Sequence, residues 1–190
     1  MTGAAPRRRP AVFLDRDGVV NQPIVAEGRP RSPASVEDFV LLPMVGEACE
    51  RLRAAGLLLV VVTNQPEVAR GTLAAETLEA MHQLLHRRVS VDAVLTCPHD
   101  DGDGCDCRKP APGLLLQAAR TWQVEMGQSV MVGDRWRDVE AGRAAGCATV
   151  WVRHRYRERF PASPDLTVNS LFDAVPWILR HSGCDRGVMT

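Results

Sequence analysis

Short apolar runs alternate with longer helical patterns along most of the chain. Within each run the apolar residues are consecutive rather than spaced by polar ones, which is typical of strands covered on both faces. The runs predict five strands, at residues 11–14, 57–62, 93–95, 129–132 and 148–152. Strands that alternate with helices predict an α/β fold, with a central parallel sheet and helices on both faces.

Apolar residues recur at helical spacing between these runs. The stripe at residues 45–52 stops before Gly56, and glycine suits the position just after a helix end. The stripe at residues 78–85 predicts a helix that we expect to begin at Thr72, whose hydroxyl could cap the first turn. Further helices are predicted at residues 114–122, 139–145 (followed by Gly146) and 171–179.

Carboxylates follow two of the predicted strands directly. Asp15 and Asp17 follow the first strand, and Asp134 and Asp138 follow the fourth. The carboxyl ends of parallel strands meet at one edge of a sheet, so these side chains should lie together. Such carboxylates would repel one another without a cation, and ligands that are all oxygen suit Mg²⁺. The pattern therefore predicts a magnesium site.

The other strand ends add a hydroxyl, amides and a lysine. Thr63, Asn64 and Gln65 close the second strand, and Lys109 follows the third. Lys109 is the only lysine among 23 basic residues, and a compact ammonium differs from a planar guanidinium where one charge must meet a phosphate oxygen. Carboxylates, a hydroxyl, a lysine and a metal site together favour phosphoryl transfer.

Three cysteines and one histidine lie within eleven residues: Cys97, His99, Cys105 and Cys107. Tetrahedral Zn²⁺ takes such a set, and four protein ligands leave no position for water, so the site would be structural. The alternatives are a loop with free thiols or a disulfide between Cys105 and Cys107, which a reducing compartment disfavours. Outside this loop we expect two core cysteines, one without a role, and four ordinary histidines: Cys49, Cys147, Cys184, His82, His86, His154 and His181.

The sequence Asp-x-Asp-Gly, then Thr, then Lys, then Gly-Asp-x-x-x-Asp, each after a strand, resembles the haloacid dehalogenase (HAD) superfamily of phosphatases. The resemblance implies a Rossmann-like HAD fold and an aspartyl-phosphate intermediate formed on Asp15. It implies that Asp17 acts as general acid and then base, and that Thr63 and Lys109 bind the phosphoryl oxygens. Mg²⁺ would be held by Asp15, Asp134 and the backbone carbonyl of Asp17, with Asp138 orienting the site from outside the ligand set.

The zinc-type loop followed by Arg-Lys-Pro resembles a narrower group within the superfamily. That group holds the D-glycero-D-manno-heptose-1,7-bisphosphate 7-phosphatases and the histidinol-phosphate phosphatases. It implies a small phosphorylated substrate, contacted by Asn21, Asn64, Gln65 and Arg108. We favour the heptose bisphosphate, with histidinol phosphate as the alternative.

Three features separate the chain from the heptose branch. Pro66-Glu67-Val68 replaces the usual Ser-Gly-Ile, and Arg135 stands where that branch often has lysine. The five residues between His99 and Cys105 match the shorter loop of the histidinol-phosphate branch.

Composition bears on partners and location. Acidic and basic residues balance at 23 each and only nine residues are aromatic, so we expect no nucleic-acid partner. The longest apolar run is too short to cross a bilayer and no signal-peptide pattern opens the chain. We therefore expect a cytoplasmic monomer with one domain over residues 1–190, a core at about 11–181, no large cap domain and no membrane partner. A catalytically inactive, zinc-stapled binding module, a phosphotransferase and a nucleic-acid-end phosphatase remain as alternatives.

Overall fold

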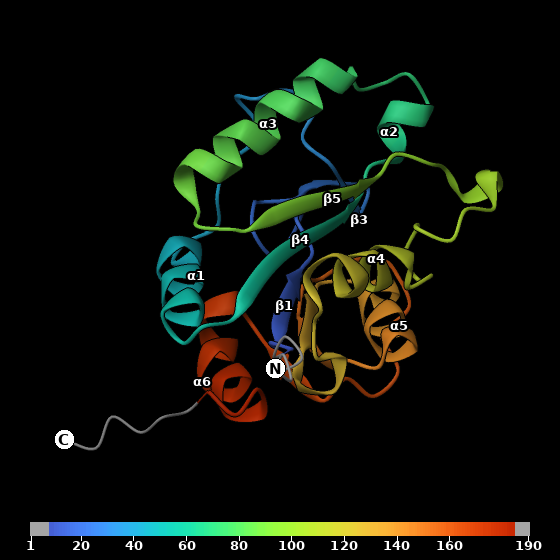
Figure 1. The fold of residues 1–190 in the computed structure, drawn as a ribbon. Helices are drawn as coiled ribbons and strands as arrows, with labels where there is room; N and C mark the ends of the chain where they lie inside the picture. Colours follow the sequence, from blue (N-terminus) through green and yellow to red (C-terminus); the bar gives the residue numbers. More distant parts are fainter. Residues whose placement is uncertain (1–7, 185–190) are drawn as a thin grey trace, which may run out of the picture.

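A six-stranded parallel sheet forms the centre of the protein. The computed structural model describes residues 8–184 and is drawn in Figure 1. The strands lie in the order β5-β4-β1-β6-β7-β8. Their bounds are β1 Ala11–Leu14, β4 Leu58–Asn64, β5 Ala93–Cys97, β6 Val130–Gly133, β7 Ala148–Val152 and β8 Leu166–Val168. This confirms the predicted α/β fold.

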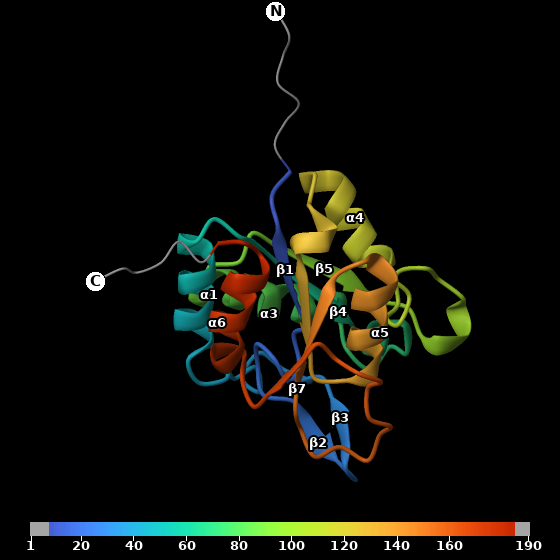
Figure 2. The ribbon, with the colours of Figure 1, turned by 90° about the horizontal axis from the view of Figure 1, so that it is seen from below.

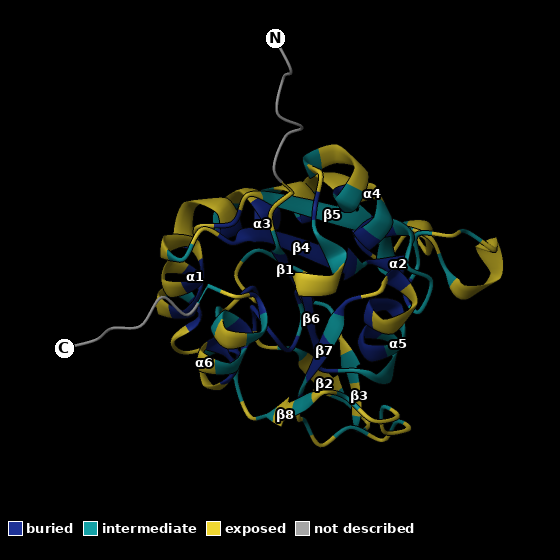
Figure 3. Ribbon diagram, turned by 60° about the horizontal axis from the view of Figure 1, so that its bottom comes forward, coloured by how far each residue is buried: buried dark blue, intermediate teal, exposed yellow. Residues whose placement is uncertain are grey.

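Helices cover both faces of the sheet. One face packs against α1 (Val45–Ala54), α3 (Ala75–Arg88) and α6 (Leu171–His181), and the other against α4 (Gly113–Trp122) and α5 (Trp136–Ala145). Figure 1 shows the two groups on opposite sides of the strands. The central strands are buried on both faces, as Figure 3 shows for β1, β4 and β6. Two-sided burial explains why their apolar residues are consecutive.

The five predicted strands and five predicted helices are all present, with small shifts at their ends. The helix predicted from Thr72 begins only at Ala75, and Ala74 occupies its cap position in extended backbone. The Thr72 hydroxyl instead donates to the Glu67 carbonyl at 3.2 Å. That part of the prediction was wrong because the short helix α2 (Pro66–Ala69) uses this segment for its own C-terminal turn.

Four elements lie outside the predicted set. Besides α2, they are the edge strand β8 and an antiparallel hairpin of β2 (Ile24–Ala26) and β3 (Arg29–Arg31). Two short 3₁₀ turns, Asp101–Asp103 and Met126–Gln128, complete the described chain. The hairpin lies between β1 and α1. Residues 8–184 contain no large cap domain. In Figure 2 the hairpin projects from the sheet beside the segment that follows β7.

The remaining cysteines divide by environment. Cys49 and Cys147 are buried in the two core clusters. Cys184 is partly buried against the core beside α6, with its thiol 3.4 Å from the Ser182 carbonyl, so it lies closer to the body of the protein than its place in the sequence indicated. No helix among the described residues is long and apolar enough to cross a membrane.

Candidate active site

Asp15 stands at the carboxyl end of the central strand. Parallel pairing of β1 with β6 continues past the strand, where the Asp15 amide donates to the Val132 carbonyl at 2.9 Å. This register brings Asp15 beside Gly133, the last residue of β6, and Asp134, which follows it. The two carboxylate motifs, more than a hundred residues apart in sequence, therefore meet at one sheet edge, as the sequence predicts.

Lys109 reaches this edge from the segment after β5. Its side chain is 2 % exposed, and its Nζ lies 2.6 Å from Asp15 Oδ1, 2.6 Å from Asp138 Oδ1 and 2.8 Å from the Val62 carbonyl. Burial lowers the pKa of the ammonium, but Asp138 and Asp15 together raise it to about 12. Lys109 is therefore charged, and all three of its N–H groups are used to hold the site together.

Three carboxylates surround this ammonium. Ligand oxygens of Asp15, Asp134 and Asp138 lie within 4.8 Å of one another. Burial, opposed in part by Lys109, raises the pKa of Asp15 to about 6. Burial and the nearby Asp15 carboxylate raise the pKa of Asp134 well above its ordinary value. Lys109 alone does not neutralise the cluster.

Asp134 shows where a cation fits. Its Oδ1 is buried and has no hydrogen-bond partner among the described residues, while Oδ2 accepts from the Tyr156 hydroxyl at 2.6 Å. An unpartnered buried carboxylate oxygen is costly unless a metal or donor completes it. The all-oxygen donor set and this orphan oxygen together fit a Mg²⁺ ion.

Two glycines make the close approach of the carboxylates possible. Gly18 has φ +93°, and a Cβ there would lie 1.9 Å from Asp134 Oδ2. A Cβ at Gly133 would lie 2.0 Å from the Cβ of Asp138. Any larger residue at either position would displace a carboxylate of the cluster.

Asp17 lies in a different electrostatic setting from Asp15. The fully buried Arg16 donates from Nη2 to both of its oxygens at 3.0 Å. Asn21, Gln65 and Ser32 donate to the same carboxylate, each at 2.9 Å. Burial alone would raise the pKa of Asp17, but Arg16 and these hydrogen bonds hold it below its ordinary value. Asp17 is thus held ionised by its partners, whereas burial makes Asp15 easier to protonate.

The predicted substrate-contacting residues divide into two groups. Asn64 and Arg108 line the cleft above Asp15, together with Thr63. Asn21 and Gln65 are fully buried behind Asp17, and their amides are used on that carboxylate. Their positions favour a role in orienting Asp17 over direct contact with a substrate.

The cysteine loop brings its four predicted ligands together. The Sγ atoms of Cys97, Cys105 and Cys107 and the Nδ1 of His99 are separated by 3.2 to 3.7 Å in the five contacting pairs. Zinc–sulfur distances of about 2.3 Å and zinc–nitrogen distances of about 2.0 Å put tetrahedral ligands about 3.5 to 3.8 Å apart. The four atoms therefore fit one tetrahedral ion, and nothing in their spacing requires a fifth ligand.

This loop is joined to the catalytic edge through Asn64. The Asn64 side chain accepts from the Lys109 backbone N–H at 3.1 Å and donates to the Lys109 carbonyl at 3.0 Å. On the loop side, Arg108 donates to Asp101 at 2.7 Å and to the His99 carbonyl at 3.0 Å. The backbone of Lys109 is thus held between the cysteine cluster and the end of β4.

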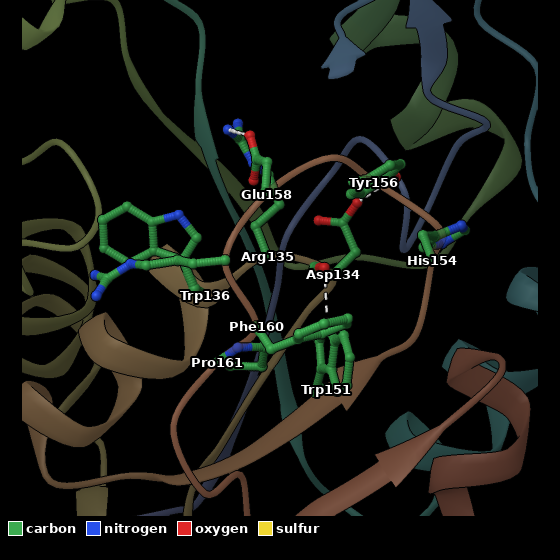
Figure 4. A pocket seen from close by; sticks show the side chains of 10 residues that line it. Asp134, Arg135, Trp136, Trp151, His154, Tyr156, Glu158, Phe160 and Pro161 are labelled. Carbon is green, nitrogen blue, oxygen red and sulfur yellow. Dashed lines mark hydrogen bonds and ion pairs between the residues drawn. The ribbon is translucent and has the colours of Figure 1, made fainter. Parts of the chain in front are cut away.

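The segment after β7 closes the other side of the site. Figure 4 shows Tyr156 bonded to the Asp134 carboxylate and Trp151 bonded to the Asp134 backbone. The Trp151 Nε1 donates to the Asp134 carbonyl at 2.9 Å. Arg135 forms an ion pair with Glu158, and His154 lies 2.8 Å from the Gly18 carbonyl.

Sequence reasoning missed several of these residues. Arg16 lies between two motif aspartates, and only this position could have indicated a role for it. Ser32, His154 and Tyr156 lie outside the motifs. From the sequence we expected His82 to be an ordinary histidine. It is buried, with Nε2 3.3 Å from Arg16, and burial lowers the pKa of His82 to about 4. A neutral His82 is therefore part of the support beneath Arg16 and Asp17.

The comparisons with known proteins agree with this geometry. Residues 106–174 match the family described as HAD-hydrolase-like. The D-glycero-β-D-manno-heptose-1,7-bisphosphate 7-phosphatase of Bordetella bronchiseptica is 41 % identical over 142 residues, which cover 72 % of this chain and 76 % of the relative. The enzyme of the same name from Vibrio cholerae is 37 % identical over 187 residues, 90 % of this chain and 97 % of the relative.

A solved structure supports the same relationship. The D,D-heptose 1,7-bisphosphate phosphatase of B. bronchiseptica, crystallised with magnesium and phosphate, superposes with a TM-score of 0.78 at 33 % sequence identity. The match covers 90 % of this chain and 98 % of that one.

Proposed function

Because this chain belongs to the HAD-like phosphatases, in the family of the heptose-1,7-bisphosphate 7-phosphatases, we propose that it removes the 7-phosphate of D-glycero-D-manno-heptose 1,7-bisphosphate. The product would be the heptose 1-phosphate. The reaction would depend on Mg²⁺ and pass through a phosphoryl group carried on Asp15.

One observation carries this proposal. A buried aspartate at the end of the central strand shares Lys109 with Asp138, and it lies near an Asp134 oxygen that has no hydrogen-bond partner within residues 8–184. The arrangement suits a phosphoryl group entering from the cleft, since it supplies a nucleophile and a fixed cation. Mg²⁺ held by Asp15, Asp134 and the Asp17 carbonyl would neutralise charge on the transferring group.

In the first step, a carboxylate oxygen of Asp15 forms a bond to phosphorus and the bond from phosphorus to the sugar oxygen breaks. Lys109 fixes the rotation of the Asp15 carboxylate through Oδ1 and stays charged throughout. Asp17 gives its proton to the departing alkoxide. Arg16 keeps Asp17 ionised in the free protein, but a phosphate dianion beside it raises its pKa, because like charges disfavour ionisation.

In the second step, water attacks the phosphorus and Asp17 takes a proton from it. The bond between phosphorus and the Asp15 oxygen breaks, which releases inorganic phosphate and restores the Asp15 carboxylate and the protonated Asp17. The Thr63 side chain lies at the cleft floor, where its hydroxyl can contact a phosphoryl oxygen; at present it accepts from the Gln65 amide at 2.8 Å.

We propose that Zn²⁺ occupies the cysteine cluster with a structural role. The four ligand atoms fit a tetrahedral ion, and the loop they close leads directly into Arg108 and Lys109. The ion would then set the direction in which Lys109 enters the site.

A phosphate-release assay tests the function directly. The purified protein is given heptose 1,7-bisphosphate and, in parallel, histidinol phosphate, each with Mg²⁺ and with excess chelator. We expect Mg²⁺-dependent release from the bisphosphate, with kcat/KM at least about tenfold higher than for histidinol phosphate, since one extra recognised group is worth about 1.4 kcal/mol or more. A higher kcat/KM on histidinol phosphate would assign the alternative substrate, and no release from either would point to a binding module.

A further inference from the structure

Cationic side chains are concentrated around the cleft above Asp15. The chain as a whole has no net charge, yet eight arginines and Lys109 line this cleft, against six acidic residues. The cleft has a volume of about 790 Å³, which is room for a sugar with more than one charged group. A single transferring phosphate does not account for so many cations.

Most of these cations already have a carboxylate partner. Lys109 and five of the arginines, Arg70, Arg108, Arg135, Arg137 and Arg159, form ion pairs. Among the described residues, the side chains of Arg29, Arg31 and Arg157 form no ion pair or hydrogen bond. All three are exposed and lie in the lining of the cleft.

The backbone brings these three arginines to the same side of the cleft. Arg29 and Arg31 are two residues apart on β3, so their side chains leave the same face of the hairpin. Arg157 is tied to the hairpin turn, since its backbone N–H donates to the Gly28 carbonyl at 2.7 Å. The stem of Arg157 packs directly on Gly28, where a Cβ would come within 2.7 Å of Cγ. Figure 2 shows the hairpin and this loop side by side.

The cluster of Arg29, Arg31 and Arg157 lies next to the proposed catalytic aspartates. Ser32, the residue after Arg31, donates to Asp17 Oδ2 at 2.9 Å and so anchors the hairpin to the proposed acid and base. Elsewhere in the cleft, Asp101 of the cysteine loop accepts from Arg108 and from Arg137 of α5. The unpaired arginines come instead from the hairpin and from the loop after β7.

We propose that Arg29, Arg31 and Arg157 bind the second, non-reacting phosphate of a sugar bisphosphate while the first is held at Asp15. The proposal rests on the phosphatase function given above and names what selects its substrate. Guanidinium groups recognise phosphate through paired hydrogen bonds, and these three have no internal carboxylate to displace first. Histidinol phosphate has no second phosphate and carries an ammonium group, which the same arginines repel.

The test measures discrimination between matched substrates. For the wild type, Arg29→Ala, Arg31→Ala, Arg157→Ala and the triple variant, kcat/KM is determined for heptose 1,7-bisphosphate and for heptose 7-phosphate. We expect each single change to reduce the bisphosphate preference about tenfold and the triple variant to reduce it at least 100-fold, mainly through KM. The rate on heptose 7-phosphate should stay within about threefold of wild type. Raising the salt concentration should lower the preference of the wild type as well.

Arg155→Ala is the matched control, because Arg155 is an exposed arginine of the same loop that does not line the cleft. It should keep the full preference for the bisphosphate. Equal preference in the triple variant, in Arg155→Ala and in the wild type would overturn the proposal. A loss of rate on both substrates alike would also overturn it, because the arginines would then act on the shared phosphate or on the fold.

A binding measurement separates this site from the proposed activity. Calorimetry on the Asp15→Asn variant compares fructose 1,6-bisphosphate with fructose 6-phosphate, so it needs neither turnover nor the correct sugar. We expect tighter binding of the bisphosphate, and loss of that difference when the three arginines are also changed. If the difference remains in the combined variant, the site is absent even where phosphatase activity is found.

Discussion

Residues 8–184 contain two clusters of possible metal ligands, which are built in opposite ways. The cysteine cluster takes all four ligands from eleven consecutive residues, and their spacing fits a closed tetrahedron. The carboxylate cluster takes Asp15 and Asp134 from the ends of two strands and Asp138 from the first turn of α5, and one Asp134 oxygen has no partner in the described part of the chain. The four atoms of the cysteine cluster would fill all positions around a tetrahedral ion, whereas the carboxylate cluster has a free position that faces an open cleft.

The comparison shows how the cysteine cluster, which is local in sequence, supports the carboxylate cluster, which the whole fold assembles. Burial, with repulsion between the carboxylates, raises the pKa of Asp15 and Asp134, so their geometry must be enforced from outside. Lys109 does this from one side, and the cysteine loop immediately precedes it. The loop after β7 does it from the other side through Tyr156.

Removal of the nucleophile should have the largest effect. We expect Asp15→Asn to reduce kcat by about 10⁴-fold or more, because monoester hydrolysis has one of the highest uncatalysed barriers. The melting temperature should be unchanged or slightly higher, since burial already disfavours the charged form of Asp15. Phosphate release and thermal melting check the two halves of this prediction. Turnover near the wild-type rate would exclude the covalent intermediate.

Loss of a zinc ligand should change metal content, stability and rate together. In Cys107→Ser we expect at least one metal equivalent to be lost, a melting temperature several degrees lower and a kcat at least about tenfold lower, because Lys109 loses its fixed approach. Metal content by mass spectrometry, melting and phosphate release are measured together, with Cys184→Ser as control. Metal-free protein with unchanged melting temperature and rate would show that the two clusters are independent.

Replacement of Lys109 tests the residue that connects the cysteine loop to the carboxylate cluster. Lys109→Arg keeps the charge, but a longer, planar group has to fit where Nζ now meets Asp15, Asp138 and the Val62 carbonyl. We expect kcat to fall about 10²-fold while the protein remains folded. Steady-state kinetics at saturating Mg²⁺ and circular dichroism provide the measurement. A rate within threefold of wild type would make lysine and arginine equivalent at this position.

The smallest effect should come from Tyr156→Phe. The change removes only the hydrogen bond to Asp134 Oδ2, so the carboxylate loses orientation but keeps its charge. We expect Mg²⁺ binding to weaken about tenfold, as when a residue that orients a metal ligand is lost, with kcat at saturating Mg²⁺ changed less than about threefold. Calorimetric titration with Mg²⁺ measures the affinity. Phe160→Leu, an exposed change on the same loop, is the control, and equal affinity in both variants would remove Tyr156 from the metal site.

The sequence was informative where the physical cause is local. Consecutive apolar residues marked the buried strands, because each strand is covered on both faces. Gly56 and Gly146 marked helix ends, since both take positive φ. Thr72 misled because its side chain could cap a helix, but whether it did so depended on α2 packing beside it. The edge strand β8 and the β2–β3 hairpin carry short, half-polar segments whose pairing exists only against their neighbours in space.

By itself, the sequence determined the alternation of strands and helices, the motif aspartates, the lone lysine and the four candidate metal ligands of the cysteine loop. Each of these can be identified within a short stretch of sequence, because its physical cause is local. The tertiary structure decided that His82 lies beside Arg16, which supports Asp17, and that Tyr156 holds Asp134. It also decided that three arginines from the hairpin and from the loop after β7 stand at one side of the cleft with no ion pair among the described residues. His82 and Arg16, Tyr156 and Asp134, and the hairpin and the later loop are far apart in the chain, and only the folded sheet and its connections make them neighbours.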